Sequence, residues 1–204
     1  MGELVEERRD VGSVTEQVAG YLEEARLLLE SLPLAPVEAV IDVLWRANRE
    51  RRHVFVLGNG GSAATSSHFA NDLAKSTIVP GQPRFRVTSL ADSVPIMLAW
   101  ANDTAFENIF AEQIESLVSP GDVVVAISGS GNSPNVLRAV QVARTHGATT
   151  VGLCGHEGGR LAGLVDHAIV ARSSVMTHIE DAHHVLQHLI CTILYRRLQA
   201  EGAL

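Results

Sequence analysis

From residue 53 onward, short apolar strands alternate with helical segments, and this alternation limits the possible folds more than any other feature of the chain. Unbroken apolar runs such as "HVFVLG", "DVVVAIS" and "TTVGLCG" are separated by segments with helical periodicity. Strands without a polar side are typical of a parallel sheet that is covered by helices on both faces. The pattern predicts an α/β protein, a three-layer sandwich around a central parallel sheet.

Two helices are expected before the first strand. Ser13 followed by Glu16 forms a capping-box pattern at the start of the first helix. Pro33 and Pro36 then interrupt the chain, and residues 37–51 show the spacing of a second helix. Its inward side chains are expected to be Val40, Val43, Leu44 and Ala47. The strands are predicted at 53–58, 84–90, 122–128, 149–155 and 167–171, and the later helices at 62–75, 93–100, 106–118, from 133 and from 177.

The length and composition favour a single domain. The chain has 204 residues, and its hydrophobic content of 46% is enough for one sizeable core. We expect one domain over residues 1–204, with N-terminal helices over 1–50 and an α/β core with a C-terminal helix over 51–204. No uncharged apolar run reaches the length of about 18 residues that a membrane span needs, and the first residues do not resemble a signal peptide. A cytoplasmic protein without a membrane partner is predicted.

Charge and cysteine usage exclude further classes. The net charge is −7 and the basic residues are scattered, whereas proteins that bind nucleic acid usually gather lysine and arginine on one face. Cys154 and Cys191 each lie in an apolar run and fit no metal or redox spacing. They are predicted to be buried free thiols.

The first polar break in the strand pattern is a glycine turn after residues 53–58. Its residues Gly58, Gly60 and Ala63 match the spacing of a dinucleotide-binding turn. That motif also requires an acid at the end of the next strand, where this chain has Ser89. Because the residue that would bind the ribose is missing, the match does not favour a nucleotide-dependent oxidoreductase.

A second turn, "SGSGNS" at residues 128–133, is rich in hydroxyl groups. Ser133 precedes Pro134 at the start of a helix, so capping the helix is a sufficient role for Ser133 alone. Ser128 and Ser130 have no such role. Serine hydroxyls, glycine amides and the positive end of a helix dipole together form a site for one phosphate group. The turn therefore predicts a phosphomonoester ligand.

Histidine and carboxylate residues are arranged in a way that suggests a metal site. His68 and Asp72 are four residues apart in a predicted helix, so their side chains are neighbours and could share an ion or simply a hydrogen bond. The C-terminal helix holds four of the nine histidines of the chain within eleven residues, namely His178, His183, His184 and His188. This concentration favours a functional role for some of them.

Four segments in order resemble the blocks of the sugar isomerase (SIS) domain, and within it the phosphoheptose isomerase family. They are "GNGGSAATSSHFANDL", "WANDTAFENIF", "GDVVVAISGSGNSPNVLRAV" and "GHEGGRLAGLVDHAIV". The similarity extends from about residue 15 to 198. It implies a flavodoxin-like sandwich, a homotetramer with active sites between subunits, a divalent metal that is usually zinc, and conversion of sedoheptulose 7-phosphate to D-glycero-D-manno-heptose 7-phosphate.

The resemblance also implies roles for individual residues. The phosphate is expected to contact Ser128, Gly129, Ser130 and Ser133, helped by Ser62, and the sugar is expected to contact Asn59, Gly60, Gly61, Asn102, Asp103 and Glu180. The Asn102–Asp103 pair is explained equally well as a capped turn between helices. The resemblance assigns acid–base catalysis to Asp72 and His188.

The implied metal ligands are His68, Asp72, Glu180 and His188. The family usually has glutamate where this chain has Asp72, and glutamine where it has Glu180. In a regular helix, residues 180 and 188 are about 12 Å apart along the axis, which is far for one ion. Thr177 and Glu180 also form a capping-box pattern, and His184 is a substitute ligand. Glu180 could still bind the metal if it lies in an irregular first turn or if the ligands are shared between subunits, and the capping role remains an equal alternative.

Two functions follow. The first is an aldose–ketose isomerase that acts through an enediol with metal assistance. The alternative is a non-catalytic SIS protein that binds a phosphosugar or a protein partner and has a regulatory or adaptor role. The retention of two histidines and two acids favours the enzyme, although the short Asp72 side chain leaves its catalytic competence as the main open point.

Overall fold

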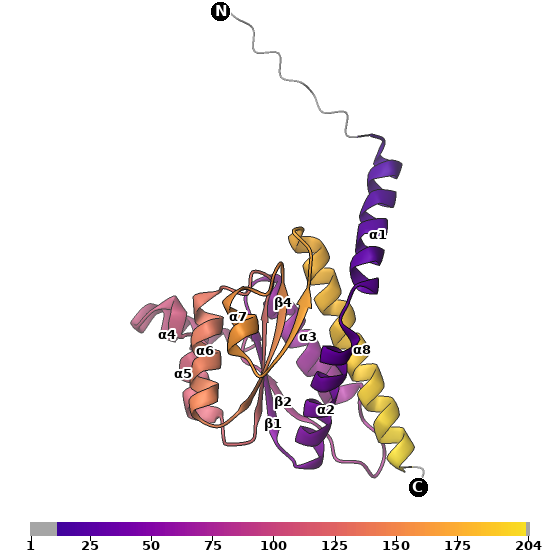
Figure 1. Ribbon diagram of the computed structural model, residues 1–204. Helices are drawn as coiled ribbons and strands as arrows, with labels where there is room; N and C mark the ends of the chain where they lie inside the picture. The colour runs from indigo at the N-terminus through magenta and orange to yellow at the C-terminus, as the bar shows by residue number, and fades with distance from the viewer. Residues whose placement is uncertain (1–11, 203–204) are drawn as a thin grey trace, which may run out of the picture.

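A five-stranded parallel sheet forms the centre of the computed structural model, which describes residues 12–202 (Figure 1). Its strands are β1 (His53–Gly58), β2 (Arg86–Ser89), β3 (Val123–Ser128), β4 (Thr149–Gly155) and β5 (His167–Ala171). Their order across the sheet is β2-β1-β3-β4-β5, and each neighbouring pair is parallel. After β1 the chain adds β2 on one side and then crosses back to add β3 on the other side. The strand order therefore reverses at the position between β1 and β3.

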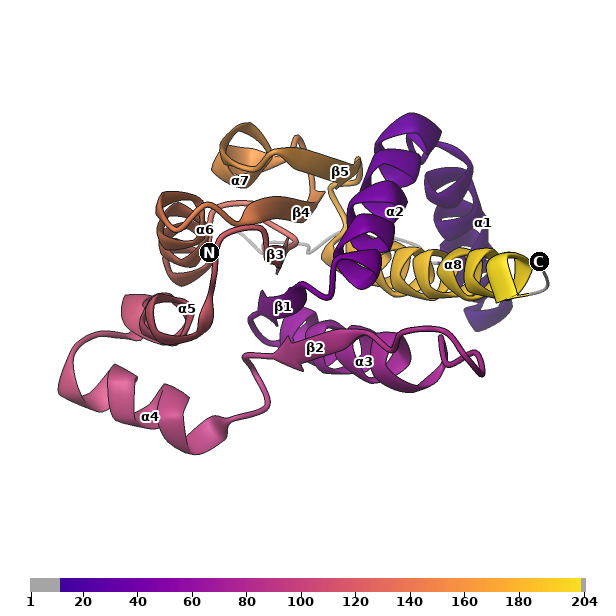
Figure 2. The same ribbon diagram turned by 90° about the horizontal axis from the view of Figure 1, so that it is seen from below.

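Helices cover both faces of this sheet, as Figure 2 shows from below. One face is covered by α2 (Leu34–Arg49), α3 (Gly61–Lys75) and α8 (Met176–Gly202), and the other by α5 (Ala111–Leu117), α6 (Pro134–Thr145) and α7 (Gly159–Leu164). The remaining helical elements are α1 (Val14–Glu30), α4 (Val94–Asp103) and the 3-10 helix η1 (Phe106–Asn108). The predicted three-layer α/β sandwich is confirmed.

The core explains why these strands lack a polar side. In β1 and β3 every side chain is buried except that of His53, because each strand packs against helices on both faces. The inward side chains expected in α2, namely Val40, Val43, Leu44 and Ala47, are buried as predicted. The two cysteines are also buried and unpaired, as predicted.

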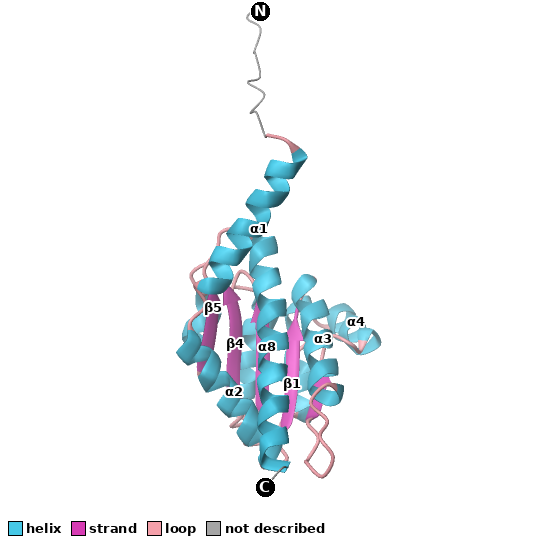
Figure 3. Cartoon of the chain, turned by 90° about the vertical axis from the view of Figure 1, so that its right-hand side faces the viewer, coloured by secondary structure: helices cyan, strands magenta, loops and turns pink. Residues whose placement is uncertain are grey.

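The helix α1 begins as expected but buries little of its surface. Ser13 and Glu16 form the predicted capping box. Leu28 is its one buried residue among those described, whereas Val14, Val18 and Leu22 are exposed. Figure 3 shows that α1 extends beyond the sheet. Residues 1–11 of the predicted N-terminal helical region, and residues 203–204, lie outside the described part of the chain.

Two segments differ from the sequence prediction. Residues 106–118 do not form one helix, but η1 followed by α5, because Ile109 and Phe110 turn into the core while Phe106 stays exposed. The short helix α7 was not expected, since its six residues are too few to show helical periodicity. Within residues 12–202, none of the helices combines the length and the apolar character needed to cross a membrane.

Candidate functional site

The glycine turn and the serine turn lie side by side at the carboxyl edge of the sheet. Gly58 at the end of β1 pairs with Ile127 of β3, and Ser128 follows directly. In open parallel sheets, ligands bind beyond the carboxyl ends of the strands where the strand order reverses. Here that position lies between β1 and β3, so the two turns share the place where a ligand is expected.

A pair of side-chain amides joins the two turns. Asn59 donates a hydrogen bond from Nδ2 to Oδ1 of Asn135, and Asn135 donates from its Nδ2 to Oδ1 of Asn59, both at 2.8 Å. Asn135 lies at the start of α6 and is buried. Asn135 was not among the residues expected from the sequence, where its only signal is a polar residue at a position where the helix faces the core. The amide pair fixes the spacing of the turns.

The serine turn gathers hydroxyl groups at the start of α6. Ser133 occupies the N-cap position of α6, yet its hydroxyl makes no capping bond and lies 3.2 Å from the hydroxyl of Ser128. Ser130 Oγ accepts a hydrogen bond from the backbone N–H of Asn132. Gly131 has a φ of +63°, a conformation that favours glycine. These hydroxyls gather at the positive end of the α6 dipole, where an anion is stabilised.

The first turns of α8 lie over both turns. A methyl group added at Gly129 would meet the sulfur of Met176, and one added at Gly61 would collide with the carboxylate of Glu180. The Glu180 carboxylate therefore lies at the start of α3, close to the glycine turn. Side chains from α8 thus form one wall of the region around the expected ligand.

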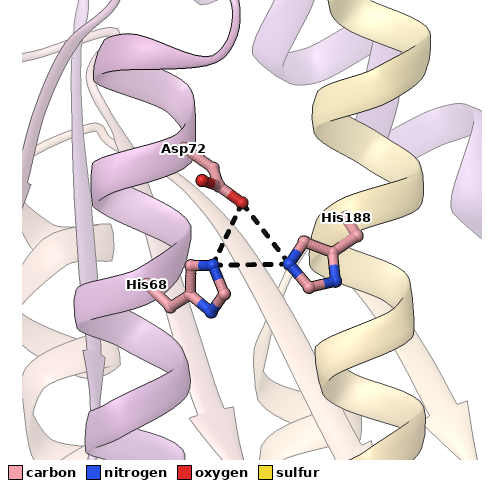
Figure 4. A group of neighbouring side chains, drawn as sticks. All are labelled: His68, Asp72 and His188. Carbon is pink, nitrogen blue, oxygen red and sulfur yellow. Dashed lines mark hydrogen bonds and ion pairs between the residues drawn. The ribbon is translucent and has the colours of Figure 1, made fainter.

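Three side chains from α3 and α8 converge on one point, two turns further along α3 (Figure 4). The Nε2 atoms of His68 and His188 are 3.4 Å apart, and Asp72 Oδ2 lies 3.4 Å from the first and 3.6 Å from the second. The Asp72 side chain is 13% exposed, whereas that of His188 is 52% exposed. The cluster is anchored on the protein side and open on the other.

The spacing of these atoms fits a metal ion. Ligand atoms placed tetrahedrally at about 2.0–2.1 Å from Zn²⁺ are about 3.3–3.4 Å from one another. Two imidazole nitrogens and one carboxylate oxygen also form a common donor set for zinc. His68, Asp72 and His188 could therefore hold a divalent metal, with a fourth position for another ligand.

Glu180, the fourth predicted ligand, is not part of this group in the described chain. It precedes His188 by eight residues of regular helix, or about 12 Å along the axis. Its carboxylate lies beside Gly61 instead. The structure brings together three of the four predicted ligands and places Glu180 at the glycine turn.

The neighbouring histidines differ in their surroundings. His184 contacts His68 and Thr65 beside the triad. His183 is buried, with Nε2 donating to the carbonyl oxygen of Cys154 at 3.1 Å. Burial lowers the pKa of His183, because a charged imidazole is poorly solvated there. His183 is therefore part of the packing between α8 and the sheet.

Asn102 and Asp103 lie apart from these groups, at the exposed end of α4. Their side chains bond to each other, with Asn102 Nδ2 donating to Asp103 Oδ1 at 2.8 Å. Within residues 12–202 neither side chain makes a hydrogen bond to the glycine turn or the serine turn. A cavity of about 240 Å³ separates α4 from the glycine turn, and its wall includes Asn59, Gly60, Met97 and Phe106.

Comparison with known proteins shows the family to which the chain is similar. Residues 20–155 match the model of the SIS domain family. The chain is 36% identical over 172 residues to a phosphoheptose isomerase of Trichlorobacter lovleyi, which covers 83% of this chain and 86% of the relative. It is also 36% identical over 191 residues to that of Geotalea daltonii, covering 91% and 98% of the two chains.

A solved structure shows the same fold. The phosphoheptose isomerase of Neisseria gonorrhoeae superposes with a TM-score of 0.83 at 26% identity, covering 89% of this chain and 98% of the other. The matching model, the relatives and the fold all extend over the two turns at the sheet edge. The chain belongs to the phosphoheptose isomerase family of SIS-domain proteins.

Proposed function

We propose that this protein is an aldose–ketose isomerase that converts sedoheptulose 7-phosphate to D-glycero-D-manno-heptose 7-phosphate. The observation that carries the proposal is that the serine turn and the glycine turn lie side by side, near a cluster of two histidines and an aspartate. Relatives at 36% identity over most of the chain are named phosphoheptose isomerases. The same features do not favour the alternative, a regulatory phosphosugar-binding protein.

The phosphate is assigned to the serine turn. Ser128, Ser130 and Ser133 supply hydroxyls, and Gly129 supplies a backbone amide, at the start of α6. Ser62 assists from the first turn of α3. Binding by neutral donors and a helix dipole suits a monoester on an acidic protein, since no lysine is needed.

The sugar is assigned to the glycine turn and its neighbours. Asn59, Gly60 and Gly61 lie next to the phosphate site, and Glu180 reaches the same turn from α8. Asn102 and Asp103 are assigned to the sugar by resemblance. They lie at the end of α4, whose residues Met97 and Leu98 line the cavity beside the glycine turn, and they are assigned to a sugar bound in this chain or in a neighbouring subunit.

The metal is assigned to His68, Asp72 and His188, and zinc is the proposed ion. In catalytic zinc sites, three protein ligands bind the ion and a fourth position is left for water or substrate. A bound zinc ion would polarise the substrate carbonyl as a Lewis acid. Glu180 is assigned to the substrate and not to the metal, because its carboxylate lies beside Gly61.

Proton transfer is assigned to Asp72 and His188. Isomerisation moves a proton between the first and second sugar carbons through an enediol, and needs a base and an acid near the carbonyl oxygens. The Asp72 carboxylate accepts the carbon-bound proton. The half-exposed His188 exchanges a proton with the substrate oxygens at Nδ1, which makes no hydrogen bond to the described residues, while its Nε2 faces the triad.

An assay coupled to the heptose product tests this function. Wild type supplied with zinc should turn over sedoheptulose 7-phosphate, and His188→Ala should lose at least about 10²-fold in kcat/KM, the range of general acid–base catalysis. His146, the partly exposed C-cap residue that follows α6 on the other face of the sheet, offers a matched control, and His146→Ala should keep full activity. Tight binding of the sugar phosphate without turnover, with zinc, manganese or iron present, would instead favour the regulatory protein.

A homotetramer in the cytoplasm, with active sites between subunits, completes the proposal. Apolar side chains are exposed on α4 and its neighbour η1, namely Val94, Ile96, Leu98 and Phe106. Apolar side chains also line a groove beside α8, among them Leu189 and Ile193. Light scattering should give the mass of four chains for wild type, and Leu98→Asp should lower it; a monomeric wild type would contradict the tetramer.

A further inference from the structure

His184 lies between the substrate-side residue Glu180 and the metal-side residue His188 on α8. Its imidazole contacts α3 on the opposite side of His68 from the triad. The Nε2 atom of His184 is 3.4 Å from Nδ1 of His68, and its Nδ1 is 3.1 Å from Oγ1 of Thr65. His184 thus touches a predicted metal ligand without joining the cluster.

These contacts continue into the backbone of α3. Thr65 Oγ1 donates its proton to the carbonyl oxygen of Gly61 at 3.2 Å. Because that carbonyl can only accept, the Thr65 hydroxyl is free to accept a hydrogen bond from His184 Nδ1–H. A neutral His184 protonated at Nδ1 then presents an unprotonated Nε2 to His68. Every link of the chain has one donor and one acceptor.

A metal ion at the triad requires this direction of the hydrogen bonds, in which His68 donates to His184 and His184 donates to Thr65. His68 faces Asp72 and His188 with Nε2, so Nε2 is the nitrogen that would bind the ion. A neutral imidazole that binds through Nε2 carries its proton on Nδ1, and that N–H needs an acceptor. Among the described residues, His184 Nε2 is the one hydrogen-bond partner of His68 Nδ1.

We propose that His184 is a positioning residue for the metal centre, which accepts the Nδ1 proton of His68 and is itself oriented by Thr65. The chain Gly61–Thr65–His184–His68 selects the tautomer and the ring orientation in which His68 Nε2 faces the ion. The inference rests on the proposed metal site. It adds the residue that prepares one of its ligands.

The test measures metal affinity, independent of catalysis. Zn²⁺ is titrated into metal-free full-length protein in competition with a chromophoric chelator. Replacing a hydrogen-bond partner of a metal-bound histidine typically weakens binding about 10- to 100-fold, and His184→Leu should fall in this range. His184→Gln keeps an acceptor oxygen near the former Nε2 position and should stay within about threefold of wild type.

Further variants separate positioning from a general effect on the helix. Thr65→Val removes the acceptor for His184 Nδ1–H and should weaken zinc binding, whereas Thr65→Ser should retain it. Val185 is exposed on α8 next to His184, so Val185→Ala should leave the affinity unchanged. Circular dichroism and the thermal midpoint of each metal-free variant check that the fold is kept.

The visible spectrum of the Co²⁺-loaded protein distinguishes positioning from direct ligation. If His184 orients His68, the d–d bands of His184→Gln should match those of wild type. Altered bands in that variant would make His184 a ligand and overturn the inference, as would unchanged zinc affinity in His184→Leu. If wild type and His188→Leu bind zinc equally weakly, the metal centre itself fails and the inference with it.

Discussion

At the scale of single residues, the distinctive feature of the site is the short carboxylate of Asp72. Its Oδ2 atom already lies within 3.6 Å of both imidazoles, so the aspartate needs no extra methylene to reach the cluster. The ligand spacing therefore matches the residue present in this chain. A longer side chain at this position must either fold back or move its carboxylate relative to the two imidazoles.

Asp72→Glu is predicted to impair the protein. The added methylene moves the carboxylate by up to about 1.5 Å, and misplacement of a catalytic group by about 1 Å can cost about 10²-fold in rate. We expect kcat/KM on sedoheptulose 7-phosphate to fall by about that factor, with weaker zinc binding in the competition titration. Asp72→Asn, which keeps the shape and removes the charge, is the matched comparison. Equal or higher kcat/KM in the glutamate variant would contradict this reading of the geometry.

The two thiols are predicted to be inert in the folded protein. Burial raises the pKa of Cys154 to about 12, and it also raises the pKa of Cys191, so neither forms a thiolate at neutral pH. An aromatic disulfide reagent at pH 8 should label no thiol in native protein and two after denaturation. Rapid labelling of either cysteine without denaturant would show that its surroundings open to solvent.

At the scale of elements, the serine turn depends on close backbone approach. Gly131 has a φ of +63° and hydrogen-bonds through its N–H to the Ser128 carbonyl oxygen. A Cβ atom at Gly131 would overlap the carbonyl group of Gly158 in the turn that precedes α7. The serine turn and the loop after β4 are therefore packed backbone to backbone.

Gly131→Ala is predicted to destabilise the protein by about 2–5 kcal/mol, from the strained φ and the steric overlap together. Chemical denaturation followed by circular dichroism measures the change. Gly163, in α7, has no neighbouring atom within 4 Å of an added Cβ, so Gly163→Ala is the control and should be neutral or stabilising by up to about 1 kcal/mol. A smaller loss at Gly131 than at Gly163 would mean that the turn is not packed as described.

At the scale of the whole molecule, α8 connects the core to the site. Figure 3 shows it lying along one face of the sheet. Its buried side, including Leu186, Ile190 and Leu194, packs in the same core cluster as β1, β3 and β4. Its other side carries Glu180, His184 and His188 toward α3. The position of the imidazoles is therefore set by packing of the core.

Folding should be less favourable in acid because of His183. Burial depresses its folded pKa below the unfolded value of about 6.5, so its contribution to stability is present above about pH 6.5 and is lost as the pH falls toward the folded pKa. His183→Gln keeps a donor to the Cys154 carbonyl and removes the titration. The free energy of unfolding in urea should fall less between pH 8 and pH 5.5 in this variant than in wild type. Equal falls would show that His183 is not held neutral.

Much of the fold was readable from local patterns. Unbroken apolar strands, helical spacing and the Ser13–Glu16 capping box correctly indicated a parallel sheet covered by helices, because burial on two faces leaves a direct trace in residue type. The glycine and serine turns were readable for the same reason, since backbone freedom and N-terminal amides depend on neighbouring residues. Patterns among neighbouring residues could not show that residues 106–118 divide into η1 and α5. That division depends on which side chains enter the core.

Tertiary structure decided how distant residues combine. Only packing brings His188 to within 3.4 Å of His68, places Glu180 beside Gly61 instead of the triad, and pairs Asn59 with Asn135. The sequence by itself determined the strands, the turns and the types of side chain that the site contains. The crossing of α8 over the sheet and α3 decided which side chains meet at the triad and at Gly61, and the packing of α6 decided the Asn59–Asn135 pair. Contacts between residues 76 to 120 positions apart depend on the packing of whole elements and leave no local pattern.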